Sequence, residues 1–244
     1  MKKSIQLIVV CTLLVSNIVQ AQRSSNQKIK GNGNVISEKR VTATYEKIAV
    51  TGFFDVELVA GAEGAITVKA EENLLPFIKI EVIDQILKIY TEKNKYISTS
   101  IGKGIVVVVP FESINQVSLT GSGDVIAKNA IRSSRFMAKL TGSGDMDLEI
   151  EATDVDASLT GSGDINLSGK TDNISSEVNG SGDIDASKLI SKNANATVSG
   201  SGDNAVSCSE SLYARVTGSG EIKYKGEPQK KDTKVTGSGS ITKS

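Results

Sequence analysis

The chain has 244 residues, of which 39% are apolar and 4% aromatic, and its 28 basic residues balance 28 acidic ones. A net charge of zero argues against nucleic acid as a partner, because binding to phosphates needs an excess of lysine and arginine. The sequence contains no histidine, so the commonest general base and metal ligand is missing. The length suffices for one elongated unit or two small domains.

Residues 1–21 are expected to be a secretory signal peptide. Lys2 and Lys3 precede an apolar run, and Ala21 supplies the small residue typical of a cleavage site. The apolar run is too short to span a membrane, so we expect no transmembrane segment in the mature chain. Export by this signal would place the protein in the periplasm, on the outer-membrane surface or outside the cell.

The next two segments differ in texture. Residues 22–34 are polar and are expected to be flexible, and the Gly-Asn-Gly-Asn sequence at 31–34 is a candidate for a first, degenerate copy of the repeated turn described below. Residues 35–115 contain short alternating runs separated by turn signals, a pattern typical of strands joined by hairpins. They also carry most of the aromatic residues. We therefore predict a β-rich N-terminal half that continues into the rest of the chain and caps it.

Residues 116–244 repeat one short phrase seven times. It consists of Leu or Val, then Thr, Asn or Ser, then Gly-Ser-Gly, and in six copies an acidic residue follows. The copies lie 18 to 21 residues apart, and such a fixed period predicts stacked structural units. Each Gly-Ser-Gly is expected to form a sharp corner, where glycine accepts positive φ and close backbone approach. The corner glycines are Gly121, Gly123, Gly142, Gly144, Gly161, Gly163, Gly180, Gly182, Gly200, Gly202, Gly218, Gly220, Gly237 and Gly239.

Apolar residues alternate with polar ones on both sides of each corner, as in strands with one buried face. A helical repeat is disfavoured, since every unit contains Gly-Ser-Gly and no apolar stripe recurs every 3.6 residues. The pattern predicts an all-β fold, a parallel β-helix of about seven coils of roughly 19 residues each. An antiparallel sandwich of seven hairpins is the alternative, but the identity between units favours stacking in register.

Six acidic residues that follow the corners would stack along one edge of such a fold. As turn residues they can accept hydrogen bonds from backbone amides. The alternative is a ladder of calcium sites, because Ca²⁺ prefers carboxylate and carbonyl oxygens, although the nonapeptide spacing of calcium-binding β-rolls is absent. No other cofactor is expected. The candidate metal ladder consists of Asp124, Asp145, Asp164, Asp183, Asp203 and Glu221.

Two features near the C-terminus have structural explanations. Cys208 alternates in phase with Val206, which favours a small core residue over a reactive thiol. Residues 222–244 are rich in lysine and contain Pro228. Lysine and proline at the open end of a β-helix discourage other chains from adding strands. A basic patch for an anionic glycan or a membrane is the alternative for this segment.

The sequence as a whole resembles a known family. The matching motifs are Phe-Asp-Val-Glu-Leu at 54–58, Val-Lys-Ala-Glu-Glu-Asn-Leu at 68–74, Ile-Glu-Val at 80–82, and the repeated Gly-Ser-Gly-Asp. They resemble the secreted bacterial auto-transporter adhesins with a head GIN domain, over about residues 40–240. The resemblance implies a right-handed parallel β-helix. The family has no established catalytic residues, so none is implied here.

Three functions are compatible with these features. The first is an exported, non-catalytic surface or envelope protein of adhesin type, whose rigid repetitive polar faces bind glycans or host or cell-surface proteins. The second is a passive structural or envelope-stress protein without a specific ligand. The third is a polysaccharide lyase or hydrolase using carboxylate pairs, for which tryptophan platforms and a histidine base are missing. Its candidate pairs are Asp145 with Asp147, and Asp183 with Asp185.

Overall fold

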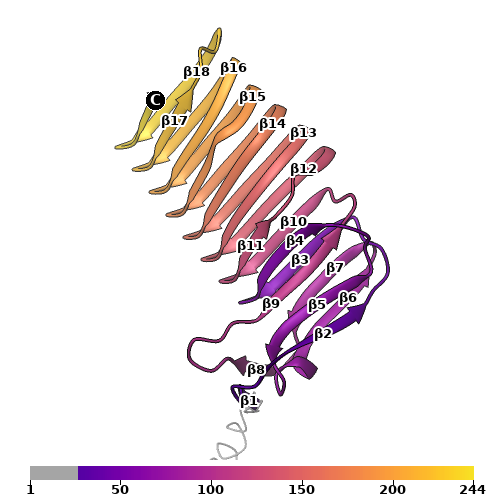
Figure 1. The fold of residues 1–244 in the computed structure, drawn as a ribbon. Coiled ribbons are helices and arrows are strands. Elements are labelled where there is room, and N and C mark those ends of the chain that lie inside the picture. The colour runs from indigo at the N-terminus through magenta and orange to yellow at the C-terminus, as the bar shows by residue number, and fades with distance from the viewer. Residues whose placement is uncertain (1–26) are drawn as a thin grey trace, which may run out of the picture.

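The computed structural model describes residues 27–244 (Figure 1). The predicted signal peptide, residues 1–21, lies outside the described residues. Over residues 27–244 the regular structure consists of strands joined by turns and loops, with one 3₁₀ turn, η1 (Leu75–Phe77). In this part of the chain, no helix is long and apolar enough to span a membrane.

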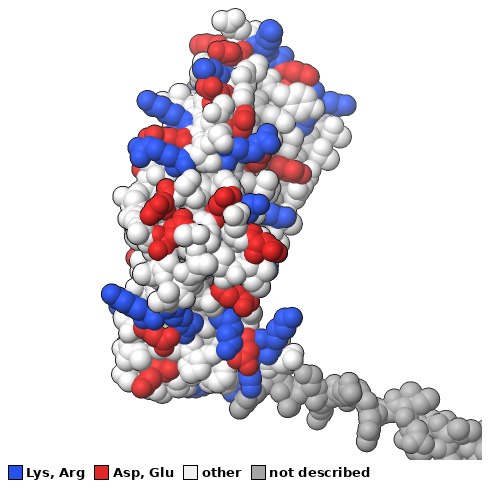
Figure 2. Space-filling view, turned by 90° about the vertical axis from the view of Figure 1, so that its right-hand side faces the viewer, with Lys and Arg blue, Asp and Glu red and all other residues white. Residues whose placement is uncertain are grey.

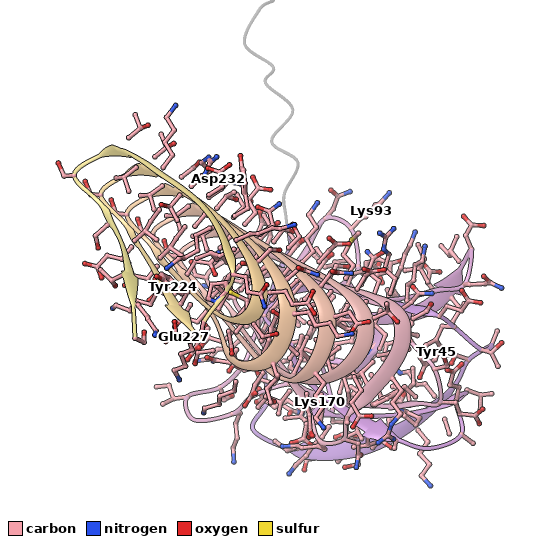
Figure 3. All side chains as sticks on the ribbon, turned by 90° about the horizontal axis from the view of Figure 1, so that it is seen from above. Tyr45, Lys93, Lys170, Tyr224, Glu227 and Asp232 are labelled. Carbon is pink, nitrogen blue, oxygen red and sulfur yellow. The ribbon has the colours of Figure 1, made fainter. Side chains whose placement is uncertain are left out.

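The repeats stack as coils of a solenoid, visible as parallel bent ribbons in Figure 1 and as superposed flattened loops in Figure 3. Every strand pairing within residues 116–244 is parallel, so the predicted β-helix is confirmed and the antiparallel sandwich is wrong. The solenoid strands are β10 (Gln116–Gly121), β11 (Asp124–Ala127), β12 (Ile131–Gly142), β13 (Asp145–Gly161), β14 (Asp164–Gly180), β15 (Asp183–Gly200), β16 (Asp203–Gly218), β17 (Glu221–Lys225), β18 (Lys230–Gly237) and β19 (Ser240–Lys243).

Each coil has two faces, separated by a corner at one edge and a bend at the other. In β13 the buried side chains are Met146, Leu148 and Ile150 on the first face, then Val155 and the alternate residues after it on the second. The burial pattern changes phase between these faces, which marks the bend. The Gly-Ser-Gly segments form the corners and lie in register from coil to coil.

The N-terminal half builds the first coil and closes one end of the solenoid. β3 and β4 pair with β10 and β11 on one side and with β7 and β9 on the other, all in parallel. Antiparallel pairing of β5 with β9, β6 with β7 and β2 with β5 then caps the stack. These strands are β2 (Val35–Val41), β3 (Lys47–Gly52), β4 (Asp55–Ala60), β5 (Ala65–Glu71), β6 (Ile78–Ile83), β7 (Ile86–Thr91) and β9 (Val106–Phe111).

The prediction that residues 31–34 form the first copy of the corner is wrong. Gly52, not the turn at 31–34, pairs in register with Gly121, and its φ of 134° matches the later corners. Phe53 and Phe54 stand where the later corners have serine and glycine, and their rings stack 5.6 Å apart. The solenoid therefore begins inside the range 35–115 that the sequence assigns to the cap.

A small second sheet lies beside the cap. Residues 27–30, expected to belong to a flexible segment, form β1 (Gln27–Lys30), which pairs in parallel with β8 (Lys95–Ser98). Both strands lie at the end of the molecule opposite the last coils (Figure 1).

One continuous hydrophobic cluster runs through the cap and the coils, from Tyr45 to Ile222. Cys208 belongs to it, as the sequence predicts, and burial raises the pKa of its thiol. Asn204 is a buried polar residue of the interior, and its amide and the Ser176 hydroxyl hydrogen-bond each other at 2.9–3.1 Å. This pairing satisfies both groups in the narrow core, where an unpaired polar atom would be costly.

Candidate functional site: a groove across the coils

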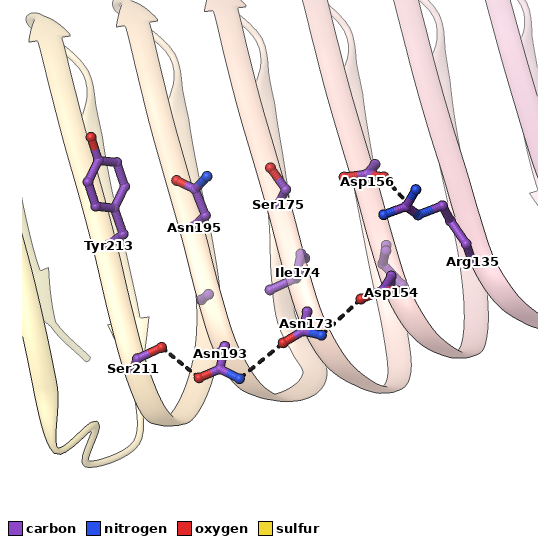
Figure 4. A pocket seen from close by; sticks show the side chains of 12 residues that line it. Arg135, Asp154, Asp156, Asn173, Ile174, Ser175, Asn193, Asn195, Ser211 and Tyr213 are labelled. Atoms are coloured by element: carbon purple, nitrogen blue, oxygen red, sulfur yellow. Dashed lines mark hydrogen bonds and ion pairs between the residues drawn. The ribbon is translucent and has the colours of Figure 1, made fainter.

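An open groove of about 500 Å³ crosses successive coils where the second face begins, next to the bend (Figure 4). Its walls combine carboxylates, amides and hydroxyls with one aromatic ring and one guanidinium group. The lining residues are Arg135, Asp154, Val155, Asp156, Asn173, Ile174, Ser175, Asn193, Ala194, Asn195, Ser211 and Tyr213.

One wall is a hydrogen-bonded row, called here the amide row, formed by Asp154, Asn173, Asn193 and Ser211, which lie in register on successive coils. The Asn173 amide donates to Asp154 at 2.8 Å, and the Asn193 amide donates to Asn173 at 3.0 Å. The Ser211 hydroxyl donates to Asn193 at 2.6 Å. These bonds orient each amide, so the row presents a fixed pattern of polar atoms.

The second row, called here the Tyr213 row, consists of Asp156, Ser175, Asn195 and Tyr213, again in register. Figure 4 shows their side chains standing side by side on successive coils. Adjacent parallel strands are about 4.8 Å apart, so the row offers one polar group per coil at that interval. At one end Arg135 lies 3.9 Å from Asp156 and brings a positive charge to the groove.

Tyr213, a residue that is 42% exposed, closes the other end of the groove with its flat ring. The Arg215 guanidinium stacks on the ring, with its central carbon 3.9 Å from the ring centroid. Asp232 holds the guanidinium by an ion pair of 2.8 Å and by its backbone carbonyl at 2.9 Å, and the hydrogen bond from Arg215 to Asp232 raises the pKa of Arg215. Stacking and ion pairing together make the Tyr213 ring a rigid platform.

The predicted acidic ladder exists as a row along the corner edge. Asp124, Asp145, Asp164 and Asp183 lie in register, and Asp203 aligns with Glu221 on the next coil. In each step a carboxylate oxygen accepts a hydrogen bond from the backbone N–H of the following member, at 2.7–3.3 Å. The acidic residues therefore tie one coil to the next.

Sequence reasoning missed one member of this ladder. Asp55 accepts the backbone N–H of Asp124 at 3.4 Å, and so occupies the same place on the first coil. Burial and the nearby charge of Asp124 raise the pKa of Asp55, while the hydrogen bond from Asp124 opposes the shift. Its position three residues after Gly52, like that of each aspartate after its own corner, was the available signal.

Calcium binding by the ladder stays a prediction to be tested. Within residues 27–244, no group of three or more acidic, histidine or cysteine side chains lies close enough together to hold a metal ion. The five aspartates of the ladder each already accept a backbone hydrogen bond, and Glu221 pairs with Lys223. We therefore expect the melting temperature to be the same in calcium and in chelator. Thermal melts followed by circular dichroism measure it. An increase of several degrees in calcium would assign the ladder to the metal, by linkage of binding to folding.

The carboxylate pairs considered for catalysis lie elsewhere on the coils. Asp145 and Asp147 are both exposed at alternate positions of one strand, as are Asp183 and Asp185. Asp185 accepts the backbone N–H of Ser187 at 2.9 Å. Neither pair lines the groove.

The lysine-rich end forms the last coils. Every residue of β18 is exposed, in line with the predicted solvated face. Lys223 pairs with Glu221 at 3.3 Å, Lys243 pairs with Glu227, and Lys231 lies over the Tyr224 ring. Three of the lysines in this segment therefore already interact with acidic or aromatic side chains of the last coils.

Several solved structures share this fold. A putative adhesin from Bacteroides fragilis NCTC 9343 matches with a TM-score of 0.82 and 23% identity, covering 88% of this chain and 100% of that one. A putative lipid binding protein from Parabacteroides distasonis ATCC 8503 matches with a TM-score of 0.75 and 27% identity, covering 89% and 100%. A putative adhesin from the same organism matches with a TM-score of 0.70 and 23% identity, covering 89% and 100%.

No protein of curated function matches the chain. The family model described as "Putative auto-transporter adhesin, head GIN domain" matches residues 44–228. This range contains the first coil, the capping strands except β2, the repeated corners up to Gly218 and the whole groove. The chain therefore belongs to the family of auto-transporter adhesins with a head GIN domain.

Proposed function

We propose that this protein is an exported, non-catalytic adhesin-type binding protein, and that the groove beside the bend takes an extended glycan. The observation that carries the proposal is the pair of polar rows that repeat once per coil and end at the Tyr213 platform. A repeating ligand matches a surface that offers one polar side chain per row on every coil, because each sugar unit then meets a hydrogen-bonding group at the same interval. The family's adhesin description agrees with a binding role.

The chemistry of the groove suits sugars in three respects. Amides, hydroxyls and carboxylates supply the donors and acceptors that hydroxyl-rich ligands need. The Tyr213 ring offers an apolar face against which a sugar ring can pack. The groove is open along its length, so an extended chain can lie across several coils without threading.

Replacing Tyr213 by alanine should weaken glycan binding by about tenfold, because the platform at the end of the groove is lost. The measurement is a screen of neutral and acidic oligosaccharides, followed by titration of the best ligand with the wild-type protein and the variant. The Tyr96→Ala variant is a matched control, since Tyr96 is also exposed but lies on β8, away from the groove.

A second pair of variants tests the polar rows. Asn195→Ala removes one member of the Tyr213 row, whereas Asn166→Ala removes an exposed amide from the first face of a neighbouring coil. We expect only Asn195→Ala to reduce binding. A folded protein that binds no glycan, matrix protein or cell surface would contradict the proposal and favour the passive structural role. Equal binding by the Asn195→Ala and Asn166→Ala proteins would move the site out of the groove.

A further inference from the structure

The end of the molecule farthest from the last coils carries a small projection, called here the tip, which consists of residues 27–34 and 92–104 (Figure 1). It contains the two-stranded β1–β8 sheet and the loops on either side of β8. The groove lies on the coils, so the tip plays no part in the proposed glycan site.

A defined turn presents one apolar side chain at the tip. The Ser100 carbonyl accepts the N–H of Lys103 at 3.0 Å, and Gly102 has a φ of 73°, as the third residue of a type II turn requires. Ile101 is the second residue of this turn and is fully exposed. Ser100 is itself bound to the buried Glu71 carboxylate through its N–H and its hydroxyl. Ile101 is therefore held out into solvent by an anchored backbone.

The small sheet of the tip carries a second exposed side chain with apolar character. Tyr96 is 60% exposed and lies in register with Lys28 on β1, so both side chains leave the sheet on the same side. A tyrosine with an apolar body and a polar end is suited to the boundary between water and lipid.

Lysine predominates in the tip. Residues 27–34 and 92–104 contain five lysines and one acidic residue, Glu92, which pairs with Lys79 at 2.8 Å. The carboxylates of Glu71 and Glu72 also contact the tip, through Ser100 and Asn34, so the lysines still outnumber the acidic groups. Lys93 occupies the second position of another turn, closed by the Lys95 N–H on the Glu92 carbonyl at 3.1 Å, and Figure 3 places it at the rim of the molecule. Figure 2 shows several basic side chains, with acidic ones between them, near the point where the described chain begins.

We propose that the tip docks on an anionic lipid surface, with Ile101 and Tyr96 entering the interface and Lys28, Lys30, Lys93 and Lys103 facing the headgroups. Exposed apolar side chains and lysines on one projection bind such surfaces through apolar burial combined with attraction to anionic lipids. Two separate apolar side chains on a narrow projection offer too little area for a stable protein interface, which favours lipid as the occupant. Docking by the tip would hold the coils, and with them the groove, away from the membrane.

The test uses sedimentation with lipid vesicles. The protein used for this test starts at residue 22. It contains every described residue and lacks the apolar run of the predicted signal peptide. We expect binding to vesicles of phosphatidylcholine and phosphatidylglycerol, weaker binding as salt rises, and no binding to phosphatidylcholine alone. Ile101→Asp should reduce the binding at least tenfold, and Ile101→Ser is a milder second variant should the aspartate disturb the fold.

A matched charge control separates the tip from general attraction. Lys28→Glu with Lys93→Glu should reduce binding at least tenfold, whereas Lys225→Glu with Lys230→Glu, the same charge change on the last coils, should leave it unchanged. Equal losses in the two double variants would overturn the proposal, as would wild-type protein that stays in solution with every vesicle. Binding to soluble heparin but not to anionic vesicles would also overturn it, and would identify a polyanion site instead.

Discussion

Replacing Gly142 by valine should lower the melting temperature by about 6–12 °C, the shift that a loss of about 3 kcal/mol gives in a domain of this size. Gly142 has a φ of 131°, and a Cβ atom there would lie 2.1 Å from the carbonyl oxygen of Gly121 on the preceding coil. Backbone strain of about 1–3 kcal/mol therefore adds to a clash that only a separation of the coils can relieve. Thermal melts followed by circular dichroism measure the effect.

The corner provides its own controls. Ser143 lies between the two glycines and is exposed, so Ser143→Val should leave the melting temperature nearly unchanged. Gly144 does not need positive φ, but a Cβ atom there would lie 2.0 Å from the Gly123 carbonyl oxygen, so Gly144→Val should lower the melting temperature as well. An unchanged melting temperature in Gly142→Val would mean that the coils are not packed as tightly at the corners as described here.

The same constraint explains why the solenoid could be predicted from the sequence. Each coil must turn at one edge without a Cβ atom and must bury every second residue beside that turn. Both requirements recur in every coil, so they leave a periodic signal. Leu140 and Leu159, two residues before their corners, are fully buried as that signal indicates.

The first coil was not predicted because its corner has a different sequence from the later ones. Phe53 and Phe54 replace the serine and the second glycine, and the buried Phe54 ring fills space at the base of the stack. The strands β7 and β9 pair with β3 and β4 on the side away from the later coils, although β7 and β9 come after β3 and β4 in the chain. Such non-local pairing depends on the packing of the whole cap, and alternation along one strand carries no information about its partner.

The groove escaped prediction for a different reason. The Tyr213 row points outward, so the core does not restrict the residue type, and Asp156, Ser175, Asn195 and Tyr213 share no chemical pattern. Only the register of the coils brings them together. Counting outward positions back from each corner glycine would have aligned them, and that was the signal available in the sequence.

The cap depends on a buried carboxylate that the sequence also did not reveal. Glu71 is fully buried and accepts hydrogen bonds from the Gly33 N–H and from the N–H and hydroxyl of Ser100. A Cβ atom on Gly31 would lie 1.9 Å from its carboxylate, so glycine is needed there for the close approach. Three segments that are distant in sequence thus meet at one charged group.

Replacing Glu71 by glutamine should lower the melting temperature at pH 7 by about 5 °C or more. The amide N–H₂ of glutamine is a donor and would face an N–H or hydroxyl group that now donates to a carboxylate oxygen, so two donors would meet without an acceptor. The Ser100 hydroxyl, above all, lowers the pKa of Glu71, and the backbone N–H groups and Lys103 act in the same direction against the effect of burial. A carboxyl group with a lowered pKa in the folded state stabilises the fold above its unfolded pKa, and this contribution disappears as pH falls through the folded value. The difference in melting temperature between wild type and Glu71→Gln should therefore be largest near pH 7 and should decrease below about pH 4.

Melts of both proteins from pH 7 to pH 3 test this, and the adjacent residue supplies the control. Glu72 is exposed and accepts one bond from the Asn34 amide at 2.9 Å, so Glu72→Gln should shift the melting temperature little at any pH. A gap for Glu71→Gln that stays constant across the pH range would show that the loss comes from packing and not from the charge. Removing a buried charge that has three hydrogen-bond donors should lower the melting temperature. If Glu71→Gln lowers the melting temperature no more than Glu72→Gln does, the Glu71 carboxylate does not hold the cap together.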